Sequence, residues 1–165
     1  MSDTVHDPVS RVRMAFEPRG ENLIVDVWLE PGGKLLPHYH PRQEERWSVV
    51  EGRCRFRLGE QTRTITPADG EIPVPPNTVH GLESDSEGDA HLRCEVEPGL
   101  RLQEFLEEAS AAARDGYFTP RGLPRGMRGT RWITGFLKRY EDETVFVSPP
   151  RFVQRALIAL FAPGS

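Results

Sequence analysis

The feature that most constrains the fold of this 165-residue chain is an alternation of apolar and polar residues that recurs between residues 11 and 97. Side chains on a β-strand point alternately to opposite faces, so each alternating stretch predicts a strand with one buried face. The pattern is clearest in residues 12–16, 23–30, 53–58 and 92–97. Turns containing Gly, Pro and Asp separate these stretches. Short strands at this spacing predict an all-β sandwich or barrel.

The pattern changes after Pro98, where helical periodicity replaces alternation. Residues 100–114 carry apolar side chains at helical spacing among Glu and Ala, which predicts a helix. Residues 117–131 are rich in Gly, Pro and Arg and are predicted to be a loop, whereas residues 132–140 can form a second helix. Ser148, followed by two prolines, predicts the start of a last helix with one broad apolar face.

We therefore predict a β-barrel domain at residues 1–98 and a helical C-terminal extension at residues 99–165. The extension is expected to pack on the barrel or at the seam of a homodimer. The apolar run 156–162 is too short to span a bilayer. The last helix could lie on a membrane surface, but packing on the barrel or at a dimer seam is favoured, so no membrane partner is expected. No signal peptide is visible at the N-terminus, which predicts a cytoplasmic protein with Cys54 and Cys94 reduced.

Charge narrows the range of partners. The net charge of −4 argues against a nucleic-acid binder. Arginine outnumbers lysine 19 to 2, which we interpret as the codon bias of a GC-rich, bacterial genome. Four arginines between residues 121 and 131 can bind an anion or close over a site as a lid, although a solvated loop is the favoured interpretation.

The most distinctive chemistry lies in residues 32–52, where two histidines stand two positions apart. On a strand, His38 and His40 would share one face, with a rise of roughly 6.6 Å between them. Imidazole suits Zn, Cu, Fe and Ni, and two histidines with one carboxylate are the ligands of non-haem Fe(II) oxygenases. The spacing therefore predicts a metal site.

Strand parity selects Glu45 rather than Glu44 as the accompanying carboxylate. Glu45 and Trp47 fall on the apolar face of the predicted strand 45–50, whereas Glu44 falls on the opposite face. A desolvated carboxylate needs a partner, which here is a metal ion or, in the alternative interpretation, an arginine. Trp47 is predicted either to line the substrate pocket or to belong to the ordinary core.

A third histidine, His80, shares parity with Leu82 and is expected to point inward. Beside the other two histidines it is interpreted as a metal ligand, and the alternative is a hydrogen-bonded core residue. His91 shares parity with Arg93 and is expected to face water. His6 lies in a polar tail that we expect to be disordered. Neither of these two histidines is predicted to bind metal.

These residues resemble the two motifs of the cupin superfamily. The first motif is matched at all its characteristic positions, which are Gly32, His38, His40, Glu45 and Gly52. Residues 75–84 resemble the second motif, although Asn77 and Ser84 replace its usual glycine and asparagine. Over about residues 20–97 the resemblance implies a jelly-roll β-barrel around one divalent transition metal, either Fe, Mn, Ni, Co, Cu or Zn. The ligands that it implies are His38, His40, Glu45 and His80.

Four protein ligands leave two positions of a six-coordinate ion open, and open positions are what catalysis requires. The resemblance therefore implies a small-molecule metalloenzyme with oxygenase-like chemistry, towards which we lean, or with Lewis-acid isomerase or lyase chemistry. The alternative is a non-catalytic ligand- or metal-binding sensor that acts through its C-terminal helices. By analogy with cupins, a homodimer is expected.

Overall fold

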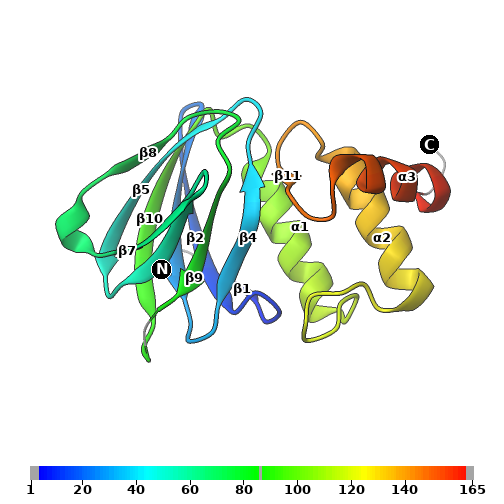
Figure 1. Cartoon of the computed structure of the whole chain (residues 1–165), viewed down its shortest axis with the longest axis horizontal. Helices are drawn as coiled ribbons and strands as arrows, with labels where there is room; N and C mark the ends of the chain where they lie inside the picture. The colour runs from blue at the N-terminus through cyan, green and yellow to red at the C-terminus, as the bar shows by residue number, and fades with distance from the viewer. Residues whose placement is uncertain (1–3, 86, 163–165) are drawn as a thin grey trace.

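The computed structural model describes residues 4–85 and 87–162, which form two antiparallel β-sheets flanked on one side by three helices (Figure 1). The first sheet contains, in order of neighbours, β1 (Val5–Asp7), β2 (Val12–Arg19), β3 (Asn22–Leu29), β10 (Ala90–Glu97), β5 (Glu44–Glu51) and β8 (Ile72–Val74). The second contains β11 (Val145–Phe146), β4 (Lys34–Tyr39), β9 (His80–Ser84), β6 (Cys54–Leu58) and β7 (Gln61–Ile65). The predicted jelly-roll fold with a helical extension is confirmed.

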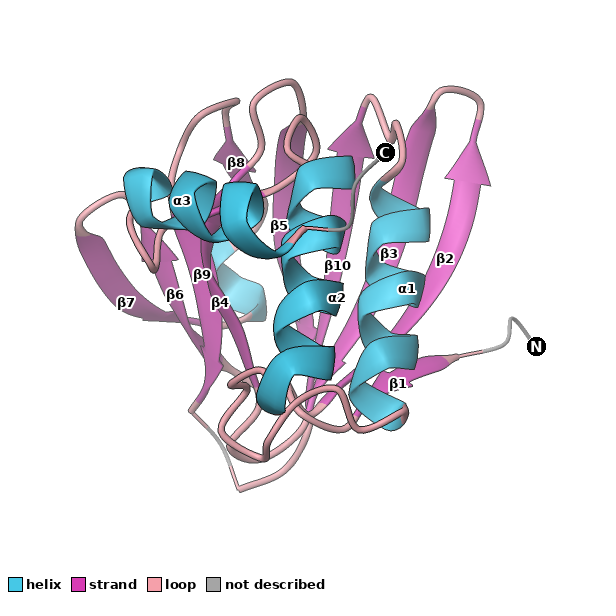
Figure 2. Cartoon of the chain, turned by 90° about the vertical axis from the view of Figure 1, so that its right-hand side faces the viewer, coloured by secondary structure: helices cyan, strands magenta, loops and turns pink. Residues whose placement is uncertain are grey.

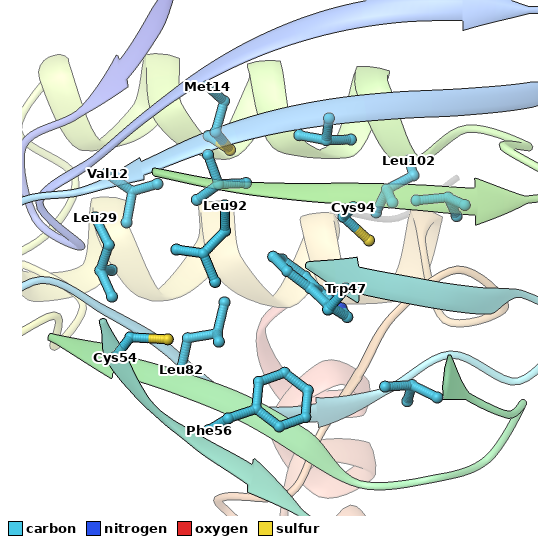
Figure 3. Close-up of a cluster of buried hydrophobic side chains, with 14 of the residues drawn as sticks. Val12, Met14, Leu29, Trp47, Cys54, Phe56, Leu82, Leu92, Cys94 and Leu102 are labelled. Carbon is cyan, nitrogen blue, oxygen red and sulfur yellow. The ribbon is translucent and has the colours of Figure 1, made fainter. Parts of the chain in front are cut away.

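The core lies between the two sheets and is built by the apolar faces that the alternation predicts (Figure 3). On β10, Leu92 and Cys94 are buried while Arg93 between them is exposed. Cys54 is likewise a buried core residue, and both cysteines are free. Each fully buried Leu, Val or Phe contributes about 1.5–3 kcal/mol relative to an exposed position.

Strand register places the candidate ligands opposite one another. On the first sheet, Glu45 of β5 lies between Val96 of β10 and Val74 of β8. On the second sheet, His38 of β4 is the direct cross-strand partner of His80 of β9, next to a local shift in the β4–β9 register. The two sheets therefore present a carboxylate and two imidazoles towards the same interior.

Three helices follow the strands: α1 (Leu102–Arg114), α2 (Gly126–Arg139) and α3 (Arg151–Phe161). The prediction of a loop over 117–131 is wrong for its last six residues, because α2 begins at Gly126. Tertiary packing explains this difference. A Cβ at Gly129 would lie 2.4 Å from the carbonyl oxygen of Tyr117, so glycine permits a close approach that outweighs its low helix propensity.

The start of the last helix also differs from the prediction. Pro150 occupies the N-cap position of α3, and no side-chain capping hydrogen bond is formed there, so Ser148 is not the cap. The buried residue of this helix is the polar Gln154, whose side-chain amide donates to the carbonyl oxygens of Phe146 and Pro149. The predicted apolar face is largely open, because Phe152 is 75% exposed.

The helices lie beside the sheets and face the viewer in Figure 2. Aromatic rings connect α1 and α2: the ring of Phe105 lies 4.8 Å from that of Phe136, which lies 4.9 Å from that of Tyr140. The chain then returns to the barrel, where β11 pairs with β4. The boundary between residues 98 and 99 stays a prediction, although one strand of the second sheet comes from the extension.

The expectation that the tail containing His6 is disordered is wrong for residues 5–7. His6 lies within β1, which pairs with β2, so this part of the tail is ordered by sheet hydrogen bonds. The His6 Nε2 atom lies 3.4 Å from the Glu30 carboxylate. Within the described ranges, no helix combines the length and apolar character needed to cross a lipid bilayer.

Candidate metal centre

Three imidazoles converge inside the barrel. His38 and His80 face each other across β4 and β9, and His40 follows directly after β4. One ring nitrogen from each histidine lies within 4.8 Å of the other two. The ring centroids of His38 and His80 are 4.3 Å apart, and those of His38 and His40 are 5.0 Å apart. The three histidines predicted from the sequence could therefore share a single ion.

The hydrogen bonds of the three rings decide which nitrogen can bind an ion. In each ring, Nδ1 lies within hydrogen-bonding distance of a main-chain carbonyl oxygen, which can only accept. Nδ1 must therefore carry the proton, and in the neutral ring Nε2 then carries the lone pair. Metal-binding histidines are commonly oriented by this kind of bond. The acceptors are Leu36 O at 2.6 Å from His38, Glu143 O at 2.7 Å from His40 and Thr78 O at 2.9 Å from His80.

Glu45 adjoins two of these lone pairs. Its Oε1 lies 3.1 Å from Nε2 of His40, and its Oε2 lies 2.8 Å from Nε2 of His80. All three side chains are at most 4% exposed. Among the described residues, neither Nε2 atom finds a hydrogen bond of good geometry. Lone pairs of neutral rings would repel a carboxylate, so either a proton on a ring nitrogen or a metal ion must lie between these atoms.

Charge states in the metal-free site agree with this interpretation. Burial of the ring, together with the neighbouring His80 and His40, lowers the pKa of His38 to about 3. Burial alone would raise the pKa of Glu45, but His40 and His80 hold that pKa well below its usual value. Burial also opposes protonation of His40, yet the charge of Glu45 leaves its pKa raised. The site therefore holds an ionised carboxylate and at least one neutral imidazole at neutral pH.

Trp47 contacts the carboxylate of Glu45. Its indole Nε1 donates a hydrogen bond to Oε2 of Glu45 at 2.7 Å. The side chain is 3% exposed, and its ring centroid lies 6.4 Å from that of Phe56 (Figure 3). Trp47 thus belongs to the core and also contacts the site, and its predicted contact with substrate stays a prediction.

Other sequence candidates lie outside the site. His91 is on the outer face, where its Nε2 lies 2.7 Å from Oδ1 of Asp26 and its ring stacks on Trp28 at 4.7 Å. His91 points outward as its parity predicts, but it faces water only in part, because its side chain is 22% exposed. Glu44 has a side chain that is 40% exposed, in agreement with its predicted outward parity.

The arginine-rich segment forms a separate surface. Arg128 and Arg131 lie on α2, and together with Arg139 they line an open hollow of about 320 Å³ against Tyr117 and Trp132. The guanidinium carbon of Arg128 lies 4.1 Å from the centroid of the Tyr117 ring. None of the three clustered histidines lines this hollow. Anion binding by these arginines stays untested, as does the favoured interpretation as a solvated loop.

Sequence reasoning missed two residues that contact the site from the extension. The carbonyl oxygen of Glu143 accepts the Nδ1 hydrogen bond of His40, and Oγ1 of Thr144 lies 3.3 Å from the same Nδ1. Both residues are buried. No periodicity or motif marked them, because a main-chain acceptor about a hundred residues away leaves no local pattern.

Comparison with known proteins supports this description. Residues 25–96, which include all four candidate ligands, match the family model described as the cupin domain. The mannose-1-phosphate guanylyltransferase RfbM of Salmonella typhimurium is 33% identical over 113 residues, which are 61% of this chain and 23% of that protein. An oxidoreductase of Arthrobotrys oligospora is 36% identical over 55 residues, 33% of this chain and 22% of that protein. The chain thus spans less than a quarter of either relative.

Solved structures show the same fold. An RmlC-like cupin from Shewanella frigidimarina superposes with a TM-score of 0.55 at 20% identity, over 62% of this chain and 89% of that one. A sugar phosphate isomerase of the cupin superfamily from Silicibacter pomeroyi gives a TM-score of 0.50 at 21% identity, over 54% and 60% of the two chains. The matched model thus identifies residues 25–96 as a cupin domain, and these two likenesses show that the chain has the fold of cupin-superfamily proteins.

Proposed function

We propose that this protein is a metal-dependent cupin enzyme in which His38, His40, Glu45 and His80 hold one divalent transition-metal ion. The observation that carries the proposal is the buried cluster of two Nε2 atoms and one carboxylate without a proper hydrogen bond among them. Three neutral imidazoles and one carboxylate suit Fe, Mn, Co, Ni, Cu and Zn, and affinity alone does not choose among these metals.

The site residues have separable roles in this proposal. The carboxylate of Glu45 supplies negative charge, and the Trp47 indole N–H keeps one of its oxygens in place. The three Nδ1–carbonyl bonds fix the ring planes, so the ligands need little rearrangement on binding. When bound, the ion would supply Lewis-acid polarisation of a substrate oxygen or would support reaction with dioxygen.

Two reaction classes follow from this ligand set. Oxygenase-like chemistry remains our favoured class, because two His and a carboxylate are a ligand set of oxygen-activating iron sites. Isomerase or lyase chemistry on a small oxygen-containing molecule is the other class. The names of two similar proteins, a sugar phosphate isomerase and a mannose-1-phosphate guanylyltransferase, make sugar phosphates the first substrates to test for it.

Elemental analysis of the chain purified without chelator tests the proposal directly. We expect close to one equivalent of a transition metal per chain, or its uptake after reconstitution with Fe(II), Mn(II), Co(II), Ni(II), Cu(II) or Zn(II). Each reconstituted form is then assayed for oxygen uptake with a metabolite panel and for isomerisation of sugar phosphates. A chain that takes up none of the six metals would contradict the proposed site.

A non-catalytic sensor is the second candidate function. It is favoured by the bond between His40 and Glu143, because this bond joins the site to the helical extension. A sensor would bind metal stoichiometrically, would show no turnover with any substrate of the panel, and would change its affinity for a partner of the extension when metal is added.

A further inference from the structure

We propose that residues 140–147, here called the C-terminal strap, belong to the metal centre. The strap positions His40 and couples the helical extension to the ion. The identity of the coupled ligand rests on the function proposed above, but the positioning of His40 does not. The extension would thus have a role that the cupin motifs leave open.

The first observation is a contrast among the three histidines. His38 and His80 are held by carbonyl oxygens only two residues away in their own segments. The acceptor for His40 is Glu143 O, which is 103 residues away and belongs to the strap. Two ligand rings are therefore oriented by the barrel itself, whereas the third is oriented only when the extension is docked.

Thr144 strengthens the same contact. Its Oγ1 lies 3.3 Å from Nδ1 of His40, so the ring N–H is shared between this hydroxyl and the carbonyl of Glu143. Thr144 is 4% exposed and His40 is 3% exposed, so water does not readily replace either acceptor. Loss of the hydroxyl would remove one of the two acceptors of the ring N–H and would leave the ring less firmly held.

The strap is held at both ends. At one end, Tyr140 packs with its ring centroid 5.4 Å from that of Phe105 on α1. At the other end, β11 pairs with β4, with Phe146 opposite His38, and the N–H of Val147 donates to the carbonyl oxygen of Pro37 at 3.1 Å. The strap is therefore held by α1 at one end and by β4, next to His38, at the other.

The side chain of Glu143 adds a third attachment. Its carboxylate is 5% exposed and accepts the main-chain N–H of Arg101, just before α1, at 3.3 Å. Its other oxygen lies 3.7 Å from the guanidinium of Arg42, two residues beyond His40. A buried carboxylate is costly without partners. Here the partners connect the His40 loop, the strap and the first helix.

These contacts predict a reciprocal coupling. If the docked strap raises the affinity of the site for an ion, the ion must stabilise the docked strap by the same factor. Groups that orient metal ligands typically change metal affinity by about 10- to 100-fold when they are removed. Glu143 and Thr144 are therefore positioning residues that act through His40.

The test compares Glu143→Gln and Thr144→Val with the control Glu141→Gln, which changes an exposed glutamate of the same strap. Co(II) is the probe, because its visible spectrum reports ligand geometry. We expect about 10- to 100-fold weaker Co(II) binding and an altered spectrum for Thr144→Val, a smaller change of the same kind for Glu143→Gln, and wild-type behaviour for the control. Wild-type Co(II) affinity and spectrum in both variants would overturn the proposal, as would an equal loss in the control.

Two further measurements separate this inference from the proposed function. In the metal-free wild type, the ring N–H proton of His40 should be visible by NMR and protected from exchange, and Thr144→Val should shift and expose it. This result holds even if no metal binds.

With Co(II), exchange of the strap amides of Thr144 and Val147 should slow in the wild type. An unprotected His40 N–H in the wild type would refute the positioning role, and unchanged strap exchange despite Co(II) binding would refute the coupling.

Discussion

The indole Nε1 of Trp47 donates a 2.7 Å hydrogen bond to the same Glu45 oxygen that lies 2.8 Å from Nε2 of His80. Trp47 and Glu45 are two residues apart on β5 and share its inner face. The strand thus places a carboxylate and the donor that orients it side by side, with the second carboxylate oxygen 3.1 Å from His40. The orientation of Glu45 is set within one strand.

Replacing Trp47 with Phe should separate this orienting effect from core packing. The variant keeps an aromatic ring beside Phe56 but removes the donor to Glu45. We expect metal affinity to fall by about tenfold and the free energy of unfolding to fall by about 1.5–3 kcal/mol, the usual contribution of a hydrogen bond to a charged group. Calorimetric titration with Co(II) and urea unfolding measure the two effects.

Trp28→Phe is the matched control for this variant, because Trp28 stacks on His91 at the outer face. It should leave Co(II) affinity unchanged. Equal affinities for the wild type and Trp47→Phe would show that the indole N–H does not hold the carboxylate for metal binding.

Replacing His40 with Ala should abolish stoichiometric metal binding and the thermal stabilisation that metal provides. A ligand that binds only the folded state stabilises it by about 2.7 kcal/mol at a concentration of 100 times Kd. Differential scanning fluorimetry with and without metal, combined with elemental analysis, measures the loss. His91→Ala is the control and should retain full metal content, because that ring bonds Asp26 on the outer face. Wild-type metal content in His40→Ala would exclude His40 as a ligand.

Metal affinity should decline as the pH falls. Without metal, burial lowers the pKa of His40, but the charge and hydrogen bonding of Glu45 outweigh burial, so the pKa lies above its usual value of 6.5. The pKa of Glu45 lies well below its usual value of 4.5, because His40 and His80 adjoin the carboxylate. A proton therefore occupies His40 below its raised pKa, and a metal must displace that proton. Titrations in buffers of different ionisation enthalpy should show proton release on binding; no release between pH 6 and 8 would contradict this protonation state.

The same two pKa shifts act on folding of the metal-free chain. The raised pKa of His40 contributes stability that is complete below 6.5 and is lost as the pH rises through the folded value. The lowered pKa of Glu45 contributes stability above 4.5 that is lost as the pH falls through its folded value. Without metal, this pair should therefore stabilise the fold most between these two limits, as urea unfolding across pH can measure.

Gly129→Ala provides a test of the packing between α2 and the preceding loop. Alanine usually favours a helix over glycine by about 0.8–1 kcal/mol. Here the new Cβ would lie 2.4 Å from the Tyr117 carbonyl oxygen, so the backbone must shift. We expect a net destabilisation of about 1–3 kcal/mol, measured by urea unfolding. Gly88→Ala is the control, because a Cβ at Gly88 would meet open space and its φ is ordinary. Gly116→Ala would not serve as a control, because Gly116 has a positive φ. A more stable Gly129→Ala would disprove the close contact.

The helical extension shows where local patterns mislead. Gly, Pro and Arg between residues 117 and 131 indicated a loop, yet residues 126–131 are helical because close packing on Tyr117 selects Gly129. The predicted Ser148 cap failed because the chain enters α3 through Pro150. At α2, packing against a preceding segment outweighs local propensity, whereas α3 begins at a proline without a capping side chain.

The faces that the barrel residues occupy follow from the order of residues along each strand. Strand parity is a local property of the backbone, so it correctly assigned Glu45 and Trp47 to the interior and His91 to the outside. The spacing of His38 and His40 and the inward parity of His80 likewise identified three rings that the fold then brings together. These inferences needed no knowledge of which strands are neighbours.

The contacts that hold those rings in place depend instead on the folding of the whole chain. The pairing of His38 with His80, the bond from Trp47 to Glu45 and the reach of Glu143 to His40 all depend on how separate segments pack. Parity specifies a face but not the partner that faces it. A main-chain carbonyl can come from any residue type, so the contribution of the strap becomes visible only once the chain has closed on itself.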